Sequence, residues 1–196
     1  MKPSADPRRR RLLKLGLGGA LAVAAGGTAL RWLAGGYGSQ LAPGDTPIAL
    51  SPKEFAVVKA FVDALIPASG AFPSGVALGV HQRIDEEMWS AAAPMRGDMK
   101  NGLQLLEHAT LLDGFGSRFT ALGAEARLAY IEALLRARPG ALQQVAFALK
   151  EMAYLFYYAR TETWKGIGYD GPFVAIPKPP DSRAAYQALV RQGSAS

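Results

Sequence analysis

Apolar residues recur every three to four positions in five stretches after residue 50, and this spacing predicts amphipathic helices. The first stretch opens with a capping box, because Ser51 precedes a proline and Glu54 follows three residues after the serine. It should end at Pro67. We expect the other helices at 76–89, at 94–112 before a glycine-containing break, at about 122–138 and at about 142–160. No stretch alternates as a strand does, so the pattern predicts an all-α fold.

The fifth stretch is the most apolar of the five. A helix that is apolar nearly all round is buried, so we place this one at the centre of a compact bundle of about five to six helices. Its main stripe consists of Leu142, Val145, Leu149, Met152 and Phe156, and its other faces carry Phe147, Leu155, Tyr157 and Tyr158.

We expect the charged side chains on the predicted helices to be exposed to solvent. Adjacent helix positions do not face each other, so Asp85, Glu86 and Glu87 should form a solvated face rather than paired catalytic carboxylates. His81, four residues before Asp85, should be a partly exposed helical histidine. On the fourth helix the residues predicted to point outward are Glu125, Arg127, Glu132 and Arg136.

Residue types that commonly catalyse reactions or bind metals are sparse. The chain has no cysteine, which excludes a disulfide, a thiolate nucleophile and a zinc–thiolate site. Its two histidines, His81 and His108, are fewer than the converging ligands that a metal site usually needs. A Gly-x-Gly-x-x-Gly string at 166–171 lacks the preceding strand of a dinucleotide site, so we interpret its glycines as turn residues. We therefore predict no catalytic, metal or cofactor-binding residue on this chain.

The C-terminal part of the chain has a different composition. Residues 161–181 hold Trp164, Tyr169 and Phe173 among four prolines and three glycines, and we expect an extended tail segment. Such a segment cannot form its own core, so it must lie over the bundle or over a partner. Ser182 should cap a short last helix to about Val190. We expect residues 50–196 to be a single helical domain and residues 35–49, rich in glycine and proline, to be a linker.

The front of the chain carries all of its net charge. Seven of the 22 basic residues and one of the 16 acidic residues precede Ala34, which accounts for the formal charge of +6. The remainder is neutral, with 15 residues of each sign. A nucleic-acid-binding domain needs clustered lysine and arginine on its folded part, so we exclude that class of partner.

Residues 1–34 have the organisation of an export leader, with basic residues followed by an apolar, glycine-rich run to Leu30. They resemble the twin-arginine leader, which sends folded proteins across a membrane. The run is shorter than the ~20 residues of a comfortable membrane span. It also lacks a clean small-residue cleavage site, so a cleaved leader and an uncleaved inner-membrane anchor helix both stay open. The motif is carried by Arg9, Arg10, Leu12, Leu13 and Lys14.

Three segments of the body resemble the gluconate 2-dehydrogenase subunit 3 family. They are the helix that runs from 50 to its Ile-Pro end at 67, the Gly-Phe-Gly junction at 114–122, and the stretch from Trp164 through Gly-Tyr-Asp-Gly-Pro to residue 172. The third segment is the most specific.

The resemblance implies a small periplasmic subunit without a cofactor of its own. Its partners would be a large FAD-dependent dehydrogenase of the glucose-methanol-choline type, in some cases a c-type cytochrome with haem c, and the twin-arginine translocase that exports the complex. The substrates of the partner enzyme would be sugars, sugar acids or alcohols.

Our first hypothesis is therefore a non-catalytic accessory subunit that supports the folding, assembly and export of a flavoprotein dehydrogenase. Buried aromatic residues often anchor interfaces, so the proposed partner surface lies in the tail. An alternative role for Trp164 and Tyr169 is to clip the tail onto the bundle. The alternative function is a stand-alone exported enzyme or ligand-binding protein with a pocket under the tail. The proposed interface residues are Trp164, Gly168, Tyr169, Asp170, Gly171, Pro172 and Phe173.

Overall fold

The computed structural model describes residues 36–172, 184 and 187–188, and these residues contain six α-helices and no strand. The predicted all-α fold is thus confirmed. Contacts divide the chain into two units, Met1–Gln40 and Leu41–Ser196. Of the first unit, the structure describes only its last five residues, which include the short 3-10 helix η1 (Gly38–Gln40). The predicted leader lies outside the described residues.

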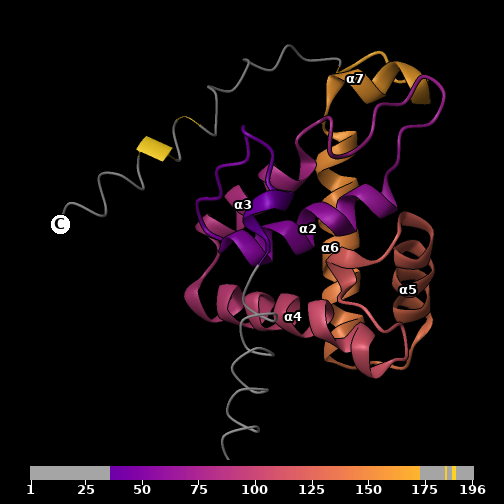
Figure 1. Cartoon of the computed structure of the whole chain (residues 1–196). Helices are drawn as coiled ribbons and strands as arrows, with labels where there is room; N and C mark the ends of the chain where they lie inside the picture. Colours follow the sequence, from indigo (N-terminus) through magenta and orange to yellow (C-terminus); the bar gives the residue numbers. More distant parts are fainter. Residues whose placement is uncertain (1–35, 173–183, 185–186, 189–196) are drawn as a thin grey trace, which may run out of the picture. The chain divides into compact units, whose positions relative to one another are not determined.

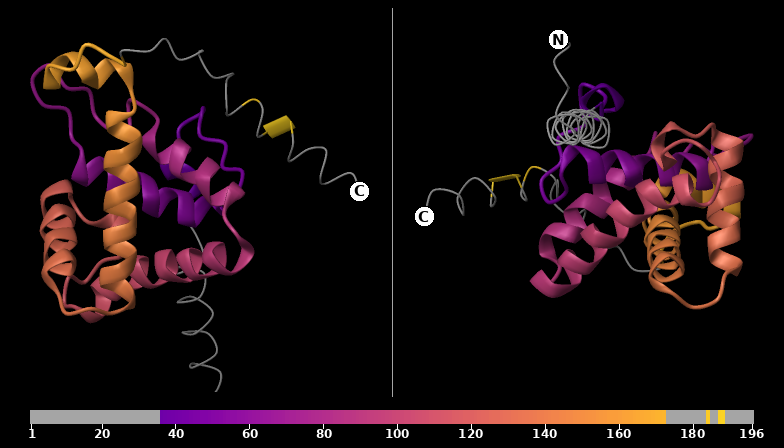
Figure 2. Two further views of the ribbon diagram at one scale, coloured as in Figure 1. Left: turned by 180° about the vertical axis from the view of Figure 1, so that it is seen from behind. Right: turned by 60° about the horizontal axis from the view of Figure 1, so that its bottom comes forward.

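The second unit is a helical bundle built from five main helices. These are α2 (Pro52–Leu65), α3 (Val80–Ser90), α4 (Ala93–Leu112), α5 (Ala124–Arg136) and α6 (Ala141–Tyr158). A 3-10 turn, η2 (Phe119–Ala121), precedes α5. In Figures 1 and 2, α5 lies alongside α6, and α4 crosses near the beginning of α6.

The helix boundaries follow from the signals in the sequence. The predicted capping box is present, since the Ser51 hydroxyl accepts from the backbone N–H of Glu54 and the Glu54 carboxylate accepts from the backbone N–H of Ser51. Helix α3 begins four residues later than expected, because Gly79 takes a left-handed conformation, with φ of 69°, directly before it. The core lies among α2–α6 and centres on the fully buried Phe55, Phe61 and Phe119.

Helix α6 corrects our prediction of a helix buried on every side. It contacts α2, α3, α4, α5 and α7, as a central helix should. However, Phe147, Leu155 and Tyr158 are 48%, 65% and 46% exposed. Its buried face is narrow and is formed by Ala146, Leu149, Ala153 and Tyr157. The second apolar face is therefore left exposed by the residues that the structure describes.

The prediction that Arg127 points outward is also wrong, because its side chain points inward. It is 9% exposed, and its guanidinium donates to the carbonyl of Leu122 at 2.8 Å and to that of Thr120 at 3.3 Å. It also lies 3.4 Å from the Asp63 carboxylate. The long side chain thus ties the start of α5 to η2 and α2, whereas Glu132 and Arg136 form the exposed pair that the spacing predicts.

The segment after α6 begins as two helical turns rather than as an extended chain. They are α7 (Thr161–Trp164) and the 3-10 turn η3 (Lys165–Ile167). The Thr163 hydroxyl donates to the Arg160 carbonyl at 2.8 Å. Residues 161–171 contain no proline that would prevent helical turns. Of the predicted last helix, the structure describes Ala184, Gln187 and Ala188, which are helical.

Candidate partner-binding surface

Trp164 fastens the C-terminal segment to the end of α6. Its indole N–H donates to the Tyr158 carbonyl at 2.9 Å, and its half-buried ring meets the ring of Tyr169 edge to face at 5.1 Å. Aromatic pairs of this geometry contribute about 0.5–1.5 kcal/mol beyond their buried area. Gly171, at φ of 109°, passes close to the same indole. Trp164 therefore performs the clipping role that we weighed against a partner contact.

A second attachment joins this segment to the loop after α2. A Cβ added to Gly166 would overlap the ring of Phe72, so only glycine permits this approach. The neighbouring Pro73 carbonyl accepts from the Tyr157 hydroxyl at 2.8 Å. The glycine string thus serves packing and turns, with Gly168 at φ of 71°, and no strand precedes it among the described residues.

The same segment also presents apolar side chains to water. Tyr169 is 42% exposed and Ile167 is 50% exposed. Asp170 and Pro172 are exposed beside them, while Phe173 and the five leader residues named above lie outside the described residues. Trp164 is therefore held by the body, and Tyr169 is the more accessible of the two predicted aromatic residues.

The exposed face of α6 continues this surface, and sequence reasoning did not identify it. The rings of Tyr154 and Tyr158 stack with centroids 6.2 Å apart, and the ammonium of Lys150 lies 4.8 Å from the centroid of the Phe147 ring. Trp164 adjoins Tyr158 through the hydrogen bond described above. The sequence did contain an indication of this exposed face, because α6 has apolar residues on more faces than one core can cover. We define the aromatic surface as Phe147, Tyr154, Leu155, Tyr158, Trp164 and Tyr169.

The titratable residues of α3 are mostly structural. The Asp85 carboxylate is fully buried and accepts from three successive backbone N–H groups, those of Ile48, Ala49 and Leu50, at 2.8–3.0 Å. Glu86 is 4% exposed and pairs with Arg83 at 3.2 Å. Only Glu87, whose side chain is 45% exposed, fits the predicted solvated face.

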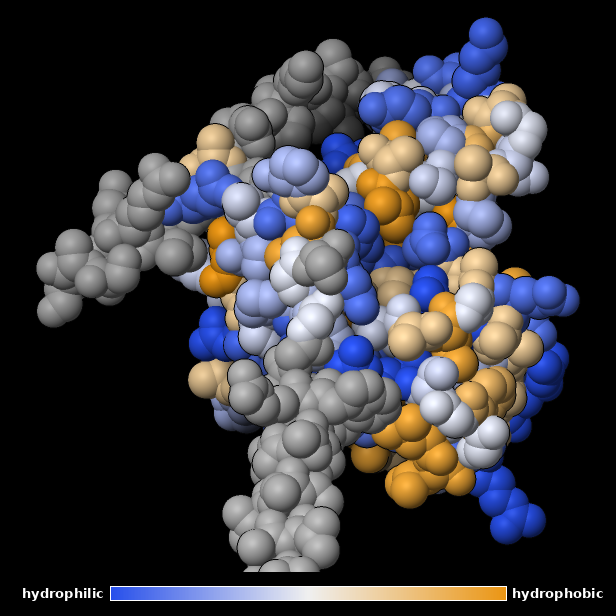
Figure 3. All heavy atoms as spheres, in the orientation of Figure 1, coloured by the Kyte–Doolittle hydropathy of each residue, from blue (hydrophilic) through white to orange (hydrophobic). Residues whose placement is uncertain are grey.

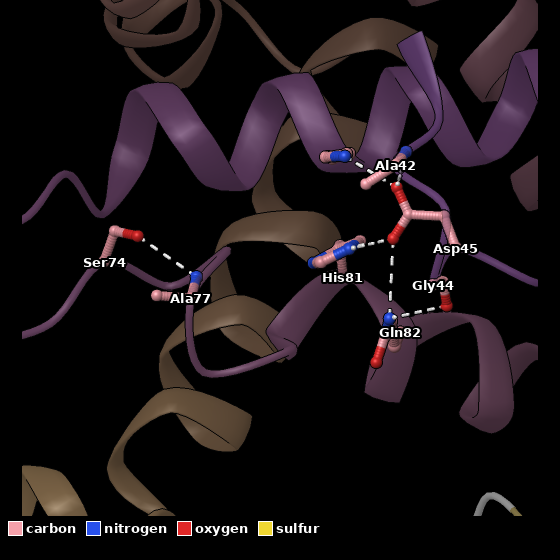
Figure 4. A network of polar contacts seen from close by, with 8 residues as sticks. Ala42, Gly44, Asp45, Ser74, Ala77, His81 and Gln82 are labelled. Carbon is pink, nitrogen blue, oxygen red and sulfur yellow. Dashed lines mark hydrogen bonds and ion pairs between the residues drawn. The ribbon is translucent and has the colours of Figure 1, made fainter. Parts of the chain in front are cut away.

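His81 is also buried, contrary to our expectation, and its ring contacts Asp45. Figure 4 shows its ring directed at the Asp45 carboxylate, at 3.2 Å from Nε2 to Oδ1. The other carboxylate oxygen accepts from Lys59 at 2.6 Å and from the backbone N–H of Ala42 at 2.8 Å. Burial alone would raise the pKa of Asp45, but the hydrogen bonds from Lys59, Ala42 and His81 together hold it well below its usual range. Residues 42–50 are thus fixed to the body by two carboxylates.

His108 lies in a second polar cluster, between α2 and α4. Its Nε2 is 2.7 Å from the Lys53 ammonium, and the adjacent Glu107 is fully buried and accepts from the backbone and hydroxyl of Thr120. Burial lowers the pKa of His108, and the positive charge of Lys53 lowers it further. A neutral histidine that accepts from the ammonium explains this arrangement.

Within the part of the chain that the structure describes, no three histidine or acidic side chains are grouped closely enough to hold a metal ion. Nor is any helix among those residues long and apolar enough to cross a membrane.

A family model described as gluconate 2-dehydrogenase subunit 3 matches residues 52–171, from the first residue of α2 to Gly171. Neither the curated proteins nor the solved structures contain a significant match. The matched range includes every residue of the aromatic surface.

Proposed function

The chain belongs to the gluconate 2-dehydrogenase subunit 3 family, and on this basis we propose that it is a non-catalytic accessory subunit of a periplasmic flavoprotein dehydrogenase. Catalysis and the FAD would reside on a large partner subunit that oxidises a sugar, a sugar acid or an alcohol. A c-type cytochrome with haem c is a further candidate member of the complex.

The observation that carries this proposal is the family match, since the family is one of dehydrogenase subunits. The aromatic surface supports it, because contiguous exposed apolar side chains commonly mark protein interfaces. Tyrosine and tryptophan are also the residue types enriched among interface anchors. A large enzyme subunit could bury this surface without any change in the fold of the small subunit.

The proposal includes a role in export. The leader motif at Arg9 and Arg10 is of the type that exports folded cargo. A catalytic subunit without a leader of its own would cross the membrane bound to this chain and remain in the periplasm. An uncleaved leader would in addition hold the complex at the inner membrane.

A purification of the native complex tests the proposal. The full chain carries a C-terminal affinity tag in its own host, and the eluate is examined for flavin absorbance, haem absorbance and dehydrogenase activity with an artificial electron acceptor. We expect a large flavoprotein to elute with the chain in a fixed ratio, and a strain without the tag serves as the control. A chain that elutes alone, without flavin, would contradict the accessory role and favour a stand-alone exported protein.

A further inference from the structure

A shallow apolar groove runs between α4, α5 and α6, next to the aromatic surface. It consists of two adjoining hollows of about 660 and 610 Å³, which share Leu105 and Ala141. The α4 residues that line the first hollow include Met95, Met99, Gly102 and Leu105, and α6 contributes Ala141, Gln144, Val145 and Ala148. Both sets recur every three to four residues, so each helix directs one continuous stripe into the groove.

The floor of the groove is formed where α4 and α6 touch. A Cβ added to Gly102 would overlap the side chain of Val145, so the two helices meet closely at this point. Ala141 and Ala148 on either side of Val145 are also small. The floor of the groove is therefore open because Gly102, Ala141 and Ala148 are small, and another helix could approach closely there for the same reason.

The edges of the groove expose large apolar side chains. Met95 is 66% exposed, Leu105 is 43% exposed, and Phe115, in the second hollow, is 40% exposed. Figure 3 shows exposed apolar atoms gathered toward the lower right of the body in this view. Side chains of this size, gathered along one groove, are typical of a surface that another molecule covers.

The two hollows of the groove carry charged residues of opposite sign. Asp98 is the charged residue of the first hollow, and Arg138 lies in the second. Within the described part of the chain, neither of these two side chains forms a hydrogen bond or an ion pair. The other charged residue of the second hollow, Asp113, accepts from the Tyr130 hydroxyl at 2.7 Å. The groove thus offers an unpaired negative charge in one hollow and an unpaired positive charge in the other.

We propose that this groove binds an amphipathic α-helix of the dehydrogenase subunit, with the N-terminus of that helix toward Asp98 and its C-terminus toward Arg138. The positive end of a helix dipole is stabilised by a carboxylate and the negative end by a guanidinium, which fixes the direction. An elongated segment can fill both hollows, and its apolar face would cover Met95, Leu105 and Phe115. The partner's identity in this proposal rests on the proposed function.

The groove adjoins the aromatic surface on α6. Helix geometry places the groove-lining positions 141, 144, 145 and 148 on a face next to that of Phe147, Leu155 and Tyr158. One partner subunit could therefore cover both, with the helix in the groove and a second contact on the aromatic surface.

Two leucines of α4 provide a matched test. Leu105 lines both hollows, whereas Leu112 is 88% exposed and lines neither. We would purify the tagged full chain from its host as wild type, as Leu105→Glu and as Leu112→Glu, and measure the flavin that elutes per chain. We expect Leu105→Glu to reduce the bound flavoprotein about tenfold or more, as for the loss of an interface anchor, and Leu112→Glu to leave it near the wild-type level. Circular dichroism melting of each variant confirms that the body is folded.

Cross-linking tests the occupant and its direction. A photoreactive phenylalanine analogue replaces Met95 in one variant and Phe115 in another, and the cross-linked peptides of the complex are identified by mass spectrometry. We expect both positions to react with one helical segment of the flavoprotein, Met95 near its N-terminal end and Phe115 near its C-terminal end.

The outcomes separate the two proposals. If the wild-type chain elutes without any flavoprotein, the proposed function is contradicted. Wild type and a folded Leu105→Glu chain that carry equal flavoprotein would overturn the groove proposal alone. Cross-links to a second copy of this chain would overturn the groove proposal as well. It would also be overturned if native mass spectrometry found a lipid or other small molecule that wild type retains and Leu105→Glu loses.

Discussion

Asp85 is one of the two carboxylates that attach the segment before α2 to the body. Its carboxylate is fully buried and accepts from a row of backbone N–H groups at residues 48–50. A carboxylate with several such bonds is well stabilised in its charged form. Asp85 of α3 therefore holds residues 48–50, while Asp45 holds the residues before them through Lys59 and His81.

Replacing Asp85 by asparagine should destabilise the body by about 3 kcal/mol, because the amide has one acceptor oxygen and would turn its own N–H₂ toward a buried donor. Urea unfolding of the purified body measures the change. Glu87→Gln is the matched control, since Glu87 lies on the same helix and its pair with Arg83 is partly exposed. Its effect should stay below about 1 kcal/mol. Equal effects from the two variants would contradict the anchoring role.

His108 should make the stability depend on pH in the mildly acidic range. Burial and the Lys53 ammonium lower the pKa of His108 below its ordinary value of 6.5, although Glu107 opposes them in part. At a pH below that ordinary value, His108 is protonated in the unfolded chain to a greater extent than in the folded chain. The free energy of unfolding should therefore fall as the pH drops from about 7 to 5, by at most about 1.4 kcal/mol per pH unit from this group.

His108→Gln provides the comparison for that pH dependence. Glutamine keeps an acceptor for Lys53 but does not titrate, so the variant should lose less stability than wild type across the same range. Urea unfolding at several pH values gives both curves. Parallel curves would show that His108 does not contribute.

The buried polar residues were the least predictable part of the structure. Adjacent acidic residues on a helix usually face water, and nothing in the spacing of Asp85 and Glu86 reveals that both are buried or that residues 48–50 contact Asp85. His81 likewise meets a residue 36 positions earlier, in a segment without periodicity. Such contacts depend on where loops lie, whereas hydrophobic periodicity reports only on the helices themselves.

Helices, by contrast, could largely be predicted. The capping box, the Ile-Pro end and the glycine breaks place α2, α4 and α5 within a few residues of their observed bounds. The burial of α6 could not be predicted, because apolar periodicity does not tell whether the second face meets this chain or another. The tail segment was identified by composition, but its attachment through Gly166 and Phe72 depends on a loop 94 residues earlier in the sequence.

The exposed face of α6 leads to a prediction about Leu155. This side chain is 65% exposed, so Leu155→Asp should change the stability of the isolated body by no more than about 0.5 kcal/mol. We expect the same change to weaken co-purification of the flavoprotein, because it places a charge in the proposed interface. Glu132→Ala, on an exposed part of α5, should affect neither property. Full flavin recovery with Leu155→Asp would remove this face from the interface.

Trp164 and Tyr169 should have separable effects. Trp164→Ala removes the hydrogen bond to Tyr158 and the packing of Gly171, so it should expose residues 165–172 to amide hydrogen exchange and to proteases. Tyr169→Ala should leave that protection nearly intact and reduce partner binding, since its ring is 42% exposed. A double variant that is as stable as wild type and fully complexed would exclude both the clip and the interface.

At the scale of the whole molecule, the net charge is distributed unevenly along the chain. The net charge of +6 belongs to the residues before Ala34, and the remainder is neutral. A neutral body with exposed aromatic residues suits association with another protein. A leader of the proposed twin-arginine type would suit export of whatever folded partner is bound to this chain.

That division predicts how a conservative change in the leader should act on the partner. Arg9→Lys combined with Arg10→Lys preserves the charge but removes the arginine pair, so the flavoprotein should accumulate in the cytoplasm together with this chain. Arg8→Lys combined with Arg11→Lys is the matched control, because it makes the same chemical change outside the pair and should leave export intact. Fractionation followed by dehydrogenase assay of the periplasm and cytoplasm measures the distribution. Normal periplasmic activity in the first variant would rule out the escort role while leaving a purely structural subunit compatible with the family.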